Sequence, residues 1–253
     1  TSGEISTETV DEIATNLSNF TSAIVQSDDD QARTNFIWSA GSYVFKSDKG
    51  ELKETYLDAK YNAILYAAQR AAQLPQQGMS RKTISAISKI PNCYLKFDKE
   101  SLNKIAVKGI TILAQDDEDS EVYVRHQLTN DLSRGIMYYE DSVGVNVDVI
   151  CYGIKEIVKP YIGQRNNNQA TLIEIRNRVT DYLLGLTNTG VSLEERRIGP
   201  QISRVDLDSI IVQLDKNLKD RVIISFDIEI PLPLNTVVVH VNAFADLSDA
   251  TSV

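Results

Sequence analysis

The sequence predicts an α/β fold of the mixed α+β kind, in which strands and helices alternate before a final group of helices and strands. Apolar residues recur at helical spacing in several long segments, while other segments alternate apolar and polar residues at period two. Gly, Pro, Asn and Asp separate the segments. The clearest period-two run ends at two prolines, Pro231 and Pro233, which cannot donate ladder hydrogen bonds. We therefore expect a terminal β-hairpin, open to strand addition, that consists of a strand before these prolines and a second strand at Thr236–Val241.

The first half of the chain is predicted to mix three helices with several strands. The helices are expected at Thr7–Gln26, Thr55–Gln73 and Ser101–Lys108, the last closed by Gly109. The strands are expected within Asn35–Phe45, at Ile110–Leu113 and at Glu121–Leu128, with a turn at Ser47–Gly50, a short apolar segment at Ile84–Ile90 and an acidic loop at Gln115–Ser120. In the strand Glu121–Leu128, the alternation predicts Val122, Val124 and His126 on one face and Tyr123, Arg125 and Gln127 on the other.

The second half begins with a largely polar segment, Asn130–Val143. Two helices are then predicted at Val145–Tyr161 and Thr171–Leu186, the second preceded by the turn or N-cap cluster Asn166–Asn168. A strand is expected near Val205–Leu214, before the terminal hairpin. The buried face of the first hairpin strand is predicted to consist of Val222, Ile224, Phe226, Ile228 and Ile230.

Composition excludes some classes of function. The chain has 253 residues and a formal net charge of −9, which argues against a nucleic-acid-binding surface because phosphate contacts need a basic patch. No stretch approaches the roughly 20 apolar residues of a membrane span, and the polar start Thr1–Glu4 is unlike a signal peptide. Cys93 and Cys151 are expected to be free thiols that behave as small apolar residues. These features predict a soluble intracellular protein that binds neither nucleic acid nor membrane.

No motif for catalysis, a cofactor or a metal is found. The only histidines, His126 and His240, fall in predicted strands without a nucleophile motif beside them, and a structural role is expected for both. Phosphate-cradling glycine loops are absent, and Asp28–Asp30 lacks the spacing of a Ca²⁺ loop. We expect no enzyme activity. An α/β enzyme such as a glycoside hydrolase stays open as the alternative, because carboxylate pairs converge in space rather than in sequence.

Several short motifs, in order, resemble the contractile phage tail sheath protein family. The run Val122–Thr129 ends in HQLT, Glu140–Asp148 carries EDSV and NVD, and Pro160–Asn166 carries PYIG and RN. Upstream, the alanine-rich run Tyr66–Pro75 ends in Leu-Pro, and Ala106–Ile110 matches the family's Gly-Ile segment before an acidic turn. Downstream, DRV at Asp220–Val222 precedes PLPLN at Pro231–Asn235. Each motif is weak alone, but the ordered set over residues 66–235 is specific.

The resemblance implies a structural subunit that forms hexameric rings, stacked helically around a tail tube, and contracts to drive the tube through a host envelope. It implies an α/β domain over residues 1–130, a C-terminal sheath domain over 131–243 and a candidate C-terminal arm over 244–253. Partners would be sister copies, the tail tube protein, and baseplate and tail terminator proteins. The location would be the virion tail, after assembly in the host cytoplasm. A sheath of a phage-tail-like bacteriocin or injection system fits the same motifs, and a baseplate or terminator component is a further alternative.

Two sets of residues are expected at contacts between subunits. In the sheath family, terminal extensions add strands to a neighbour's C-terminal sheet, and main-chain hydrogen bonds make such strand addition strong without a particular side chain. Charge contacts are expected from the loop Glu194, Glu195, Arg196 and Arg197, for which a solvated loop is the alternative. The residues expected to take part in strand addition are Val237, Val239, Val241, Ala243, Phe244, Ala245 and Leu247.

Overall fold

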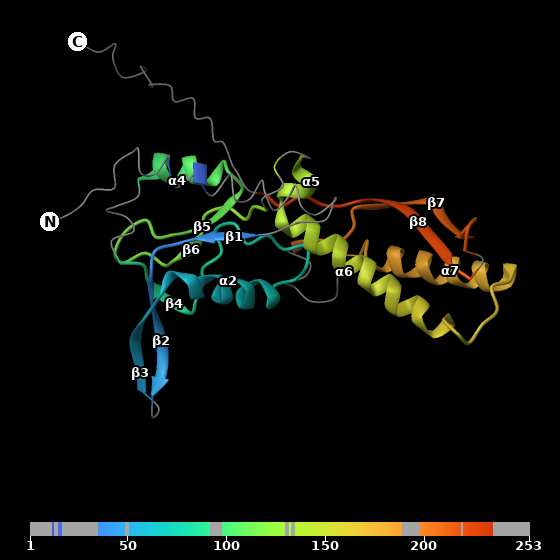
Figure 1. Ribbon diagram of the computed structural model, residues 1–253, viewed down its shortest axis with the longest axis horizontal. Coiled ribbons are helices and arrows are strands. Elements are labelled where there is room, and N and C mark those ends of the chain that lie inside the picture. Colours follow the sequence, from blue (N-terminus) through green and yellow to red (C-terminus); the bar gives the residue numbers. More distant parts are fainter. Residues whose placement is uncertain are drawn as a thin grey trace, which may run out of the picture.

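A computed structural model describes residues 12, 15–16, 35–48, 51–91, 98–129, 132, 135–188, 198–218 and 220–234. Buried hydrophobic side chains form two separate clusters, one from the first half of the chain and one from the second. Figure 1 shows the two halves following one another along the longest axis of the molecule. The elements, in chain order, are β1 (Phe36–Trp38), β2 (Ser42–Asp48), β3 (Glu51–Leu57), η1 (Ala59–Tyr61), α2 (Asn62–Ala71), β4 (Ile87–Lys89), α4 (Lys99–Ala106), β5 (Ile110–Ala114), β6 (Tyr123–Val124), α5 (Ile136–Tyr139), α6 (Asp141–Val158), η2 (Lys159–Tyr161), α7 (Gln169–Gly185), β7 (Arg204–Leu214) and β8 (Val222–Glu229).

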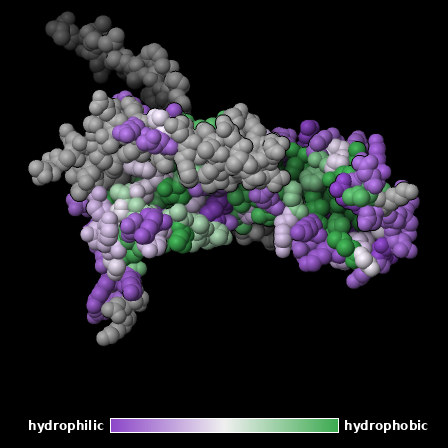
Figure 2. All heavy atoms as spheres, viewed as in Figure 1, coloured by the Kyte–Doolittle hydropathy of each residue, from purple (hydrophilic) through white to green (hydrophobic). Residues whose placement is uncertain are grey.

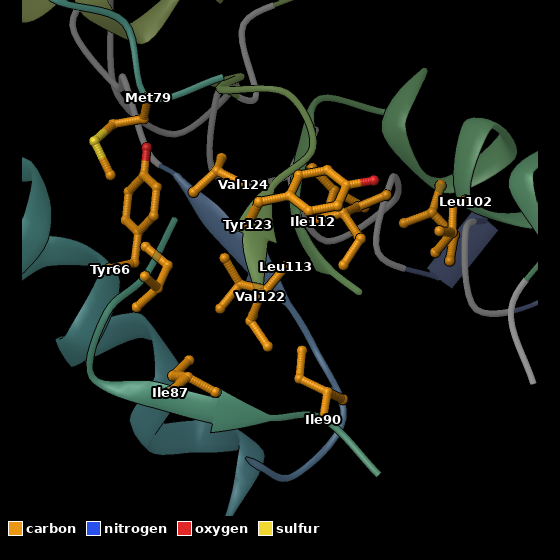
Figure 3. Close-up of a cluster of buried hydrophobic side chains, with 14 residues drawn as sticks. Tyr66, Met79, Ile87, Ile90, Leu102, Ile112, Leu113, Val122, Tyr123 and Val124 are labelled. Carbon is orange, nitrogen blue, oxygen red and sulfur yellow. The ribbon is translucent and has the colours of Figure 1, made fainter. Parts of the chain in front are cut away.

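The first half is built around a three-stranded sheet with the order β1-β5-β6. β1 runs parallel to β5, and β5 runs antiparallel to β6. Helices α2 and α4 lie on opposite sides of this sheet (Figure 1). All five residues of β5 are buried, as the continuous apolar run of its sequence predicted. Figure 3 shows the resulting core: Leu113 and Val122 lie toward Tyr66 and Ile87, and Ile112 lies beside Tyr123, toward Leu102.

A second sheet has the order β3-β2-β4, and β2 and β3 pair over seven residues as a hairpin. The hairpin projects from the body of the molecule (Figure 1). Two predictions were therefore wrong: β2 continues through Asp48 instead of turning at Ser47, and Thr55–Leu57 finish β3 instead of opening a helix. Pairing with β2 overrides the weak helical preference of this segment. The helix begins only at Asn62, after Asp58 caps the short η1 turn.

The predicted two-faced strand Glu121–Leu128 is also wrong, since β6 contains only Tyr123 and Val124. Val122 is buried together with both of these residues. The cause is a segment on the other side of β6: the backbone N–H of Ile84 donates to Val122, and Val124 exchanges backbone hydrogen bonds with Arg81 and Lys82. Beyond β6, Gln127 is fully buried and the His126 side chain is 37% exposed, so their predicted faces are reversed.

The helix ends follow local capping rules. The Asp98 side chain accepts from the backbone N–H of Ser101 at 2.7 Å and starts α4, while Gly109, at a φ of 77°, follows its C-terminus. Asn168 caps α7 by accepting from Thr171 at 2.9 Å, as the sequence predicted. By contrast, α6 begins four residues earlier than expected, at Asp141. At this helix start, the polar residues Glu140 and Asp141 are buried.

The second half consists of α6, α7 and a two-stranded antiparallel sheet, β7-β8. The two helices lie side by side on one side of the sheet (Figure 1). β7 and β8 fall where strands were expected, and β8 pairs with β7. The expected hairpin partner of β8, Thr236–Val241, lies outside the described residues. The domain boundaries at residues 130 and 243 stay predictions.

Two further sequence predictions concern membranes and thiols. Among the described residues, no helix combines the length and the apolar character that a bilayer crossing needs. Cys151 forms no disulfide, as expected, but it is exposed rather than buried with the apolar residues. Cys93 and most of the predicted helix Thr7–Gln26 lie outside the described residues, although Glu12, Thr15 and Asn16 are helical.

Candidate functional site: a polar junction and an open sheet

Buried polar side chains lie between the two hydrophobic clusters. Arg70, from α2, places its Nε 3.4 Å from Oδ2 of Asp141, at the start of α6, and these side chains are only 10% and 12% exposed. The amide of Gln127 donates to the same carboxylate oxygen and, through its own oxygen, accepts from the backbone N–H of Met79. Arg70 also donates to the carbonyls of Leu74 and Pro75. This network, here called the polar junction, connects both halves through one carboxylate.

A second carboxylate of the polar junction belongs to Glu140, whose side chain is fully buried. Its Oε2 lies 3.6 Å from Nε2 of His126, and its Oε1 accepts a hydrogen bond from Ser142 at 3.1 Å. Beside it, the backbone N–H of Thr129 donates to the backbone carbonyl of Tyr139, and the Thr129 hydroxyl donates to the backbone carbonyl of Tyr138. A buried carboxylate is tolerated only when its lost hydration is compensated, and the Ser142 hydroxyl is one donor that does so here.

Tyr66 shows the electrostatic effect of the polar junction. Its side chain is buried near both carboxylates and contacts the first hydrophobic cluster. Burial raises the pKa of Tyr66 above its ordinary value of 10.0, and the negative charge of Asp141 raises it further. The phenol is therefore neutral across the physiological range and acts as a packing residue.

The motifs found in the sequence meet in this junction. Arg70 comes from the alanine-rich run, Gln127 and Thr129 from HQLT, and Glu140 and Asp141 from EDSV. Sequence reasoning identified these segments by resemblance but missed their contacts, because Arg70 and Asp141 are 71 positions apart. In the described part of the chain, no three His, Cys, Asp or Glu side chains are placed to hold a metal ion.

The sheet β7-β8 is the second feature of the site. In β8, Val222, Ile224, Phe226 and Ile228 turn toward the helices, while Ile223, Ser225, Asp227 and Glu229 are exposed, as the alternation predicted. In the described residues this sheet has two strands, so each strand pairs along one side only. Backbone groups along an outer strand side are available to a further strand.

An irregularity interrupts β7 between Asp206 and Ile211, opposite Phe226 of β8. The hydroxyl of Ser209 replaces part of the ladder there: it accepts from the backbone N–H of Asp227 at 2.7 Å and donates to the carbonyl of Asp206 at 2.7 Å. Arg176, from α7, donates to the carbonyl of Ile210 at 2.8 Å. These contacts join the bulged part of β7 to β8 and to α7.

The structure does not test the residues that were singled out for contacts between subunits. The strand-addition set from Val237 to Leu247 lies outside the described residues, and so does the charged loop Glu194–Arg197. His240 lies outside them as well, while His126 has the structural contact with Glu140 described above.

Comparison with solved structures gives the fold. A crystal structure of a sheath tail protein from Listeria innocua superposes with a TM-score of 0.61 at 15% identity, covering 90% of this chain and 52% of that one. The chain has the fold of contractile tail sheath proteins. The helical sheath of the anti-feeding prophage in the contracted state superposes with a TM-score of 0.55 at 14% identity, covering 90% of this chain and 66% of that one. A chain in the baseplate of the same prophage superposes with a TM-score of 0.58 at 13% identity, covering 92% of this chain and 66% of that one.

The chain thus spans between about half and two thirds of the length of these structures. No family model matches the sequence, and no curated protein matches it. At this level of identity, the ordered motifs and the superposition agree on the fold of a tail sheath protein.

Proposed function

We propose that this protein is a tail sheath subunit that polymerises as helically stacked hexameric rings around a tail tube and contracts to drive the tube through a host envelope. The observation that carries the proposal is the sheath fold combined with a two-stranded sheet at the C-terminal half. Heterologous contacts that do not close a ring produce helical polymers, which a sheath requires. The proposed role is structural, without catalysis or a cofactor.

Strand addition is the proposed link between copies. Residues 236–243 would complete the sheet that contains β8, and residues 244–253 would extend to a sister copy. The contributing residues would be Val237, Val239, Val241, Ala243, Phe244, Ala245 and Leu247. Main-chain hydrogen bonds tolerate sliding and rotation of whole subunits better than side-chain contacts do, because they need no particular neighbour. The charged loop Glu194–Arg197 is proposed as an additional contact between copies.

The proposed partners, besides sister copies, are the tail tube, baseplate and tail terminator proteins, at the tail of a virion that assembles in the host cytoplasm. A contractile injection system is the second candidate setting. The similarity to the anti-feeding prophage sheath and to the PVC sheath complex of an extracellular contractile injection system favours it specifically. In either setting the subunit has the same mechanical role.

Electron microscopy of the purified protein tests the proposal. We expect rings or helical tubes from the intact chain, and persistent monomers at high concentration would contradict the sheath role. A variant without Phe244–Val253 should keep its circular dichroism spectrum and lose most of its polymerisation. The matched control replaces the same ten residues with a glycine-serine linker of equal length, which should polymerise less than the intact chain because glycine has a low strand propensity. Undiminished polymerisation of the truncated chain would show that the arm assignment is wrong.

A further inference from the structure

β8 presents a continuous row of backbone groups on the side away from β7. Facing β7, the carbonyl of Arg221 accepts from the backbone N–H of Asp215 at 2.8 Å. Further along, the backbone N–H of Asp227 donates to the Ser209 hydroxyl at 2.7 Å. Backbone groups alternate in direction along a strand, so every second residue of β8 points its N–H and C=O groups away from β7. These residues are Val222, Ile224, Phe226 and Ile228, and no described strand lies on that side.

The corresponding side of β7 is in contact with α7. Ile211 has the same place in the strand repeat as Asp215, so its N–H faces β8, and the carbonyl of Ile210, in the same peptide unit, points away from β8. Arg176, from α7, donates to this carbonyl through Nε at 2.8 Å and to the carbonyl of Leu207 through Nη2 at 3.4 Å. One guanidinium therefore occupies two backbone acceptors at the bulge of β7.

A second contact with α7 lies just before β7. The backbone N–H of Ile202 donates to the carbonyl of Leu186, the C-cap of α7, at 3.2 Å. After the bulge, the outward row of β7 continues at Val212 and Leu214. Typical strands contain about five or six residues, which suits the eight residues of β8 better than the short regular end of β7.

We propose that an extended segment of a second copy pairs along the outer side of β8, and that Arg176 keeps the outer side of β7 from accepting such a segment. This contact rests on the proposed function and specifies the edge at which its strand addition takes place. Occupied carbonyls and a bulge act against pairing at the wrong edge, as charged side chains and bulges do on other edge strands. Each copy gives a segment at one surface and accepts one at another, so the contact is heterologous.

Residues 236–243 are the segment whose sequence fits this edge. In an extended conformation, Val237, Val239 and Val241 share one face. The side chains of β8 that turn toward the helices are also apolar, and they are only partly buried. Figure 2 shows a strip of hydrophobic residues, bordered by hydrophilic ones, at this end of the molecule. A neighbouring strand with valines on the same side would cover the apolar side chains of β8.

Charge favours the same segment. On the exposed face of the sheet, Asp206 lies directly opposite Asp227. Like charges on neighbouring strands repel each other, so a strand added beside Asp227 should not bring a third carboxylate. Residues 236–243 contain no Asp or Glu, whereas residues 244–253 contain Asp246 and Asp249.

Cysteine crosslinking tests which edge accepts the segment. One chain carries Ser225→Cys, on the exposed face of β8, and in the control it carries Gln213→Cys instead. Gln213 is the matched position because it is exposed on the same face of β7, so that a strand added along β8 lies about 10 Å away from it. All chains also carry Cys93→Ser and Cys151→Ser. The second chain carries one cysteine, at three alternative positions that allow for the register: Val238→Cys, His240→Cys or Asn242→Cys.

The chains are mixed under oxidising conditions. We expect the best Ser225→Cys mixture to give the disulfide-linked dimer in roughly tenfold higher yield than the best Gln213→Cys mixture, because pairing raises the effective concentration of the two thiols. Equal yields at the two edges would overturn the proposal. A chain that carries both Ser225→Cys and His240→Cys should form linked dimers and larger oligomers. An intrachain disulfide as its main product would also overturn the proposal, since the edge would then be filled by the same chain.

Substitution of Arg176 tests its role at the β7 edge. Arg176→Leu removes both donors, and we expect the crosslinking yield at Gln213→Cys to rise at least severalfold while the yield at Ser225→Cys stays the same. Arg176→Lys is a milder second variant, whose single ammonium group cannot replace both contacts, and it should give a smaller rise. Arg178→Leu is the control: it removes an exposed ion pair with Glu174 and should change neither yield. Circular dichroism checks that each variant folds. An unchanged yield at Gln213→Cys in the Arg176→Leu protein would show that Arg176 does not close the β7 edge.

The outcome is separable from that of the sheath proposal. Rings or tubes of the intact chain without selective crosslinking at Ser225→Cys would overturn the edge assignment alone. Selective crosslinking in a protein that forms only short oligomers would support the edge assignment and contradict the sheath role.

Discussion

β5 in the first half and β8 in the second half differ in how they are paired and buried. β5 pairs on both sides, with β1 and β6, and all five of its residues are buried. β8 has only β7 beside it in the described residues, and every second side chain is exposed. β5 is therefore paired on both sides by strands of its own chain. Within the described residues, the outer sides of β7 and β8 have no strand partner, which is the physical requirement for linking copies by strand addition.

The largest effect is expected where the halves are joined. Arg70→Met leaves the buried Asp141 carboxylate without its positive partner and should lower the free energy of unfolding by about 3–5 kcal/mol. The double variant Arg70→Met/Asp141→Leu should recover much of this loss, because no charge is then buried. Urea denaturation measures both. The control is Arg178→Met, which removes an exposed ion pair with Glu174 and should lower the free energy of unfolding by less than about 0.5 kcal/mol. A small effect of Arg70→Met alone would mean that the junction does not hold the halves together.

The contrast between β5 and β8 predicts the next effect. Ile112→Ala, in the fully buried β5, should cost about 2–5 kcal/mol by removing packed methyl groups. Ile223 is 39% exposed on the other face of β8. Ile223→Ala should therefore change the free energy of unfolding of the unassembled chain by less than about 1 kcal/mol. Comparable losses in urea denaturation at the two positions would show that β8 is as enclosed as β5.

A smaller effect is expected at the bulge in β7. Ser209→Ala removes the hydroxyl that accepts from Asp227 and donates to Asp206, and it should cost about 0.5–1.5 kcal/mol. Ser225→Ala, on the exposed face of β8, is the matched control and should be nearly neutral. Hydrogen exchange of the Asp227 amide reports the lost bond directly. Unchanged protection of that amide in Ser209→Ala would show that the hydroxyl does not support the ladder.

The smallest expected effect is the acid dependence of the β7–β8 turn. The backbone N–H of Asn217 and the Arg221 guanidinium hold the pKa of Asp215 below its ordinary value of 3.8. A lowered folded pKa means that Asp215 stabilises the fold above pH 3.8 and loses this contribution as the pH falls through the folded pKa. In Asp215→Asn, stability should therefore fall less steeply below that pH. Urea denaturation midpoints of the variant and the wild type, measured at a series of decreasing pH values, give the two slopes of stability against pH.

Sequence patterns predicted the elements whose surroundings follow a simple rule. β5 is enclosed on both faces and is encoded by the continuous run Ile110–Ala114, whereas β8 is enclosed on one face and is encoded by strict alternation. The caps at Asp98 and Asn168 are local, so they act over three residues. The predicted start at Ser101 was two residues late, since α4 begins at Lys99 after its cap Asp98.

The elements that depend on distant partners could not be predicted. Glu140 and Asp141 are polar, and polarity alone indicates solvent exposure; only Arg70 and Gln127, far away in the sequence, make their burial tolerable. In the same way, β3 is set by pairing with β2, and the short β6 by hydrogen bonds to residues 81–84. The ordered motifs did mark the junction segments, but as a resemblance rather than as a contact.

Cryo-electron microscopy of the assembled protein tests the central claim most directly. The account predicts that, in the polymer, strands from sister copies lie along the β7-β8 sheet and complete its backbone hydrogen bonds. A particle in which each chain seals this sheet with its own residues, and no neighbouring copy touches it, would contradict the account.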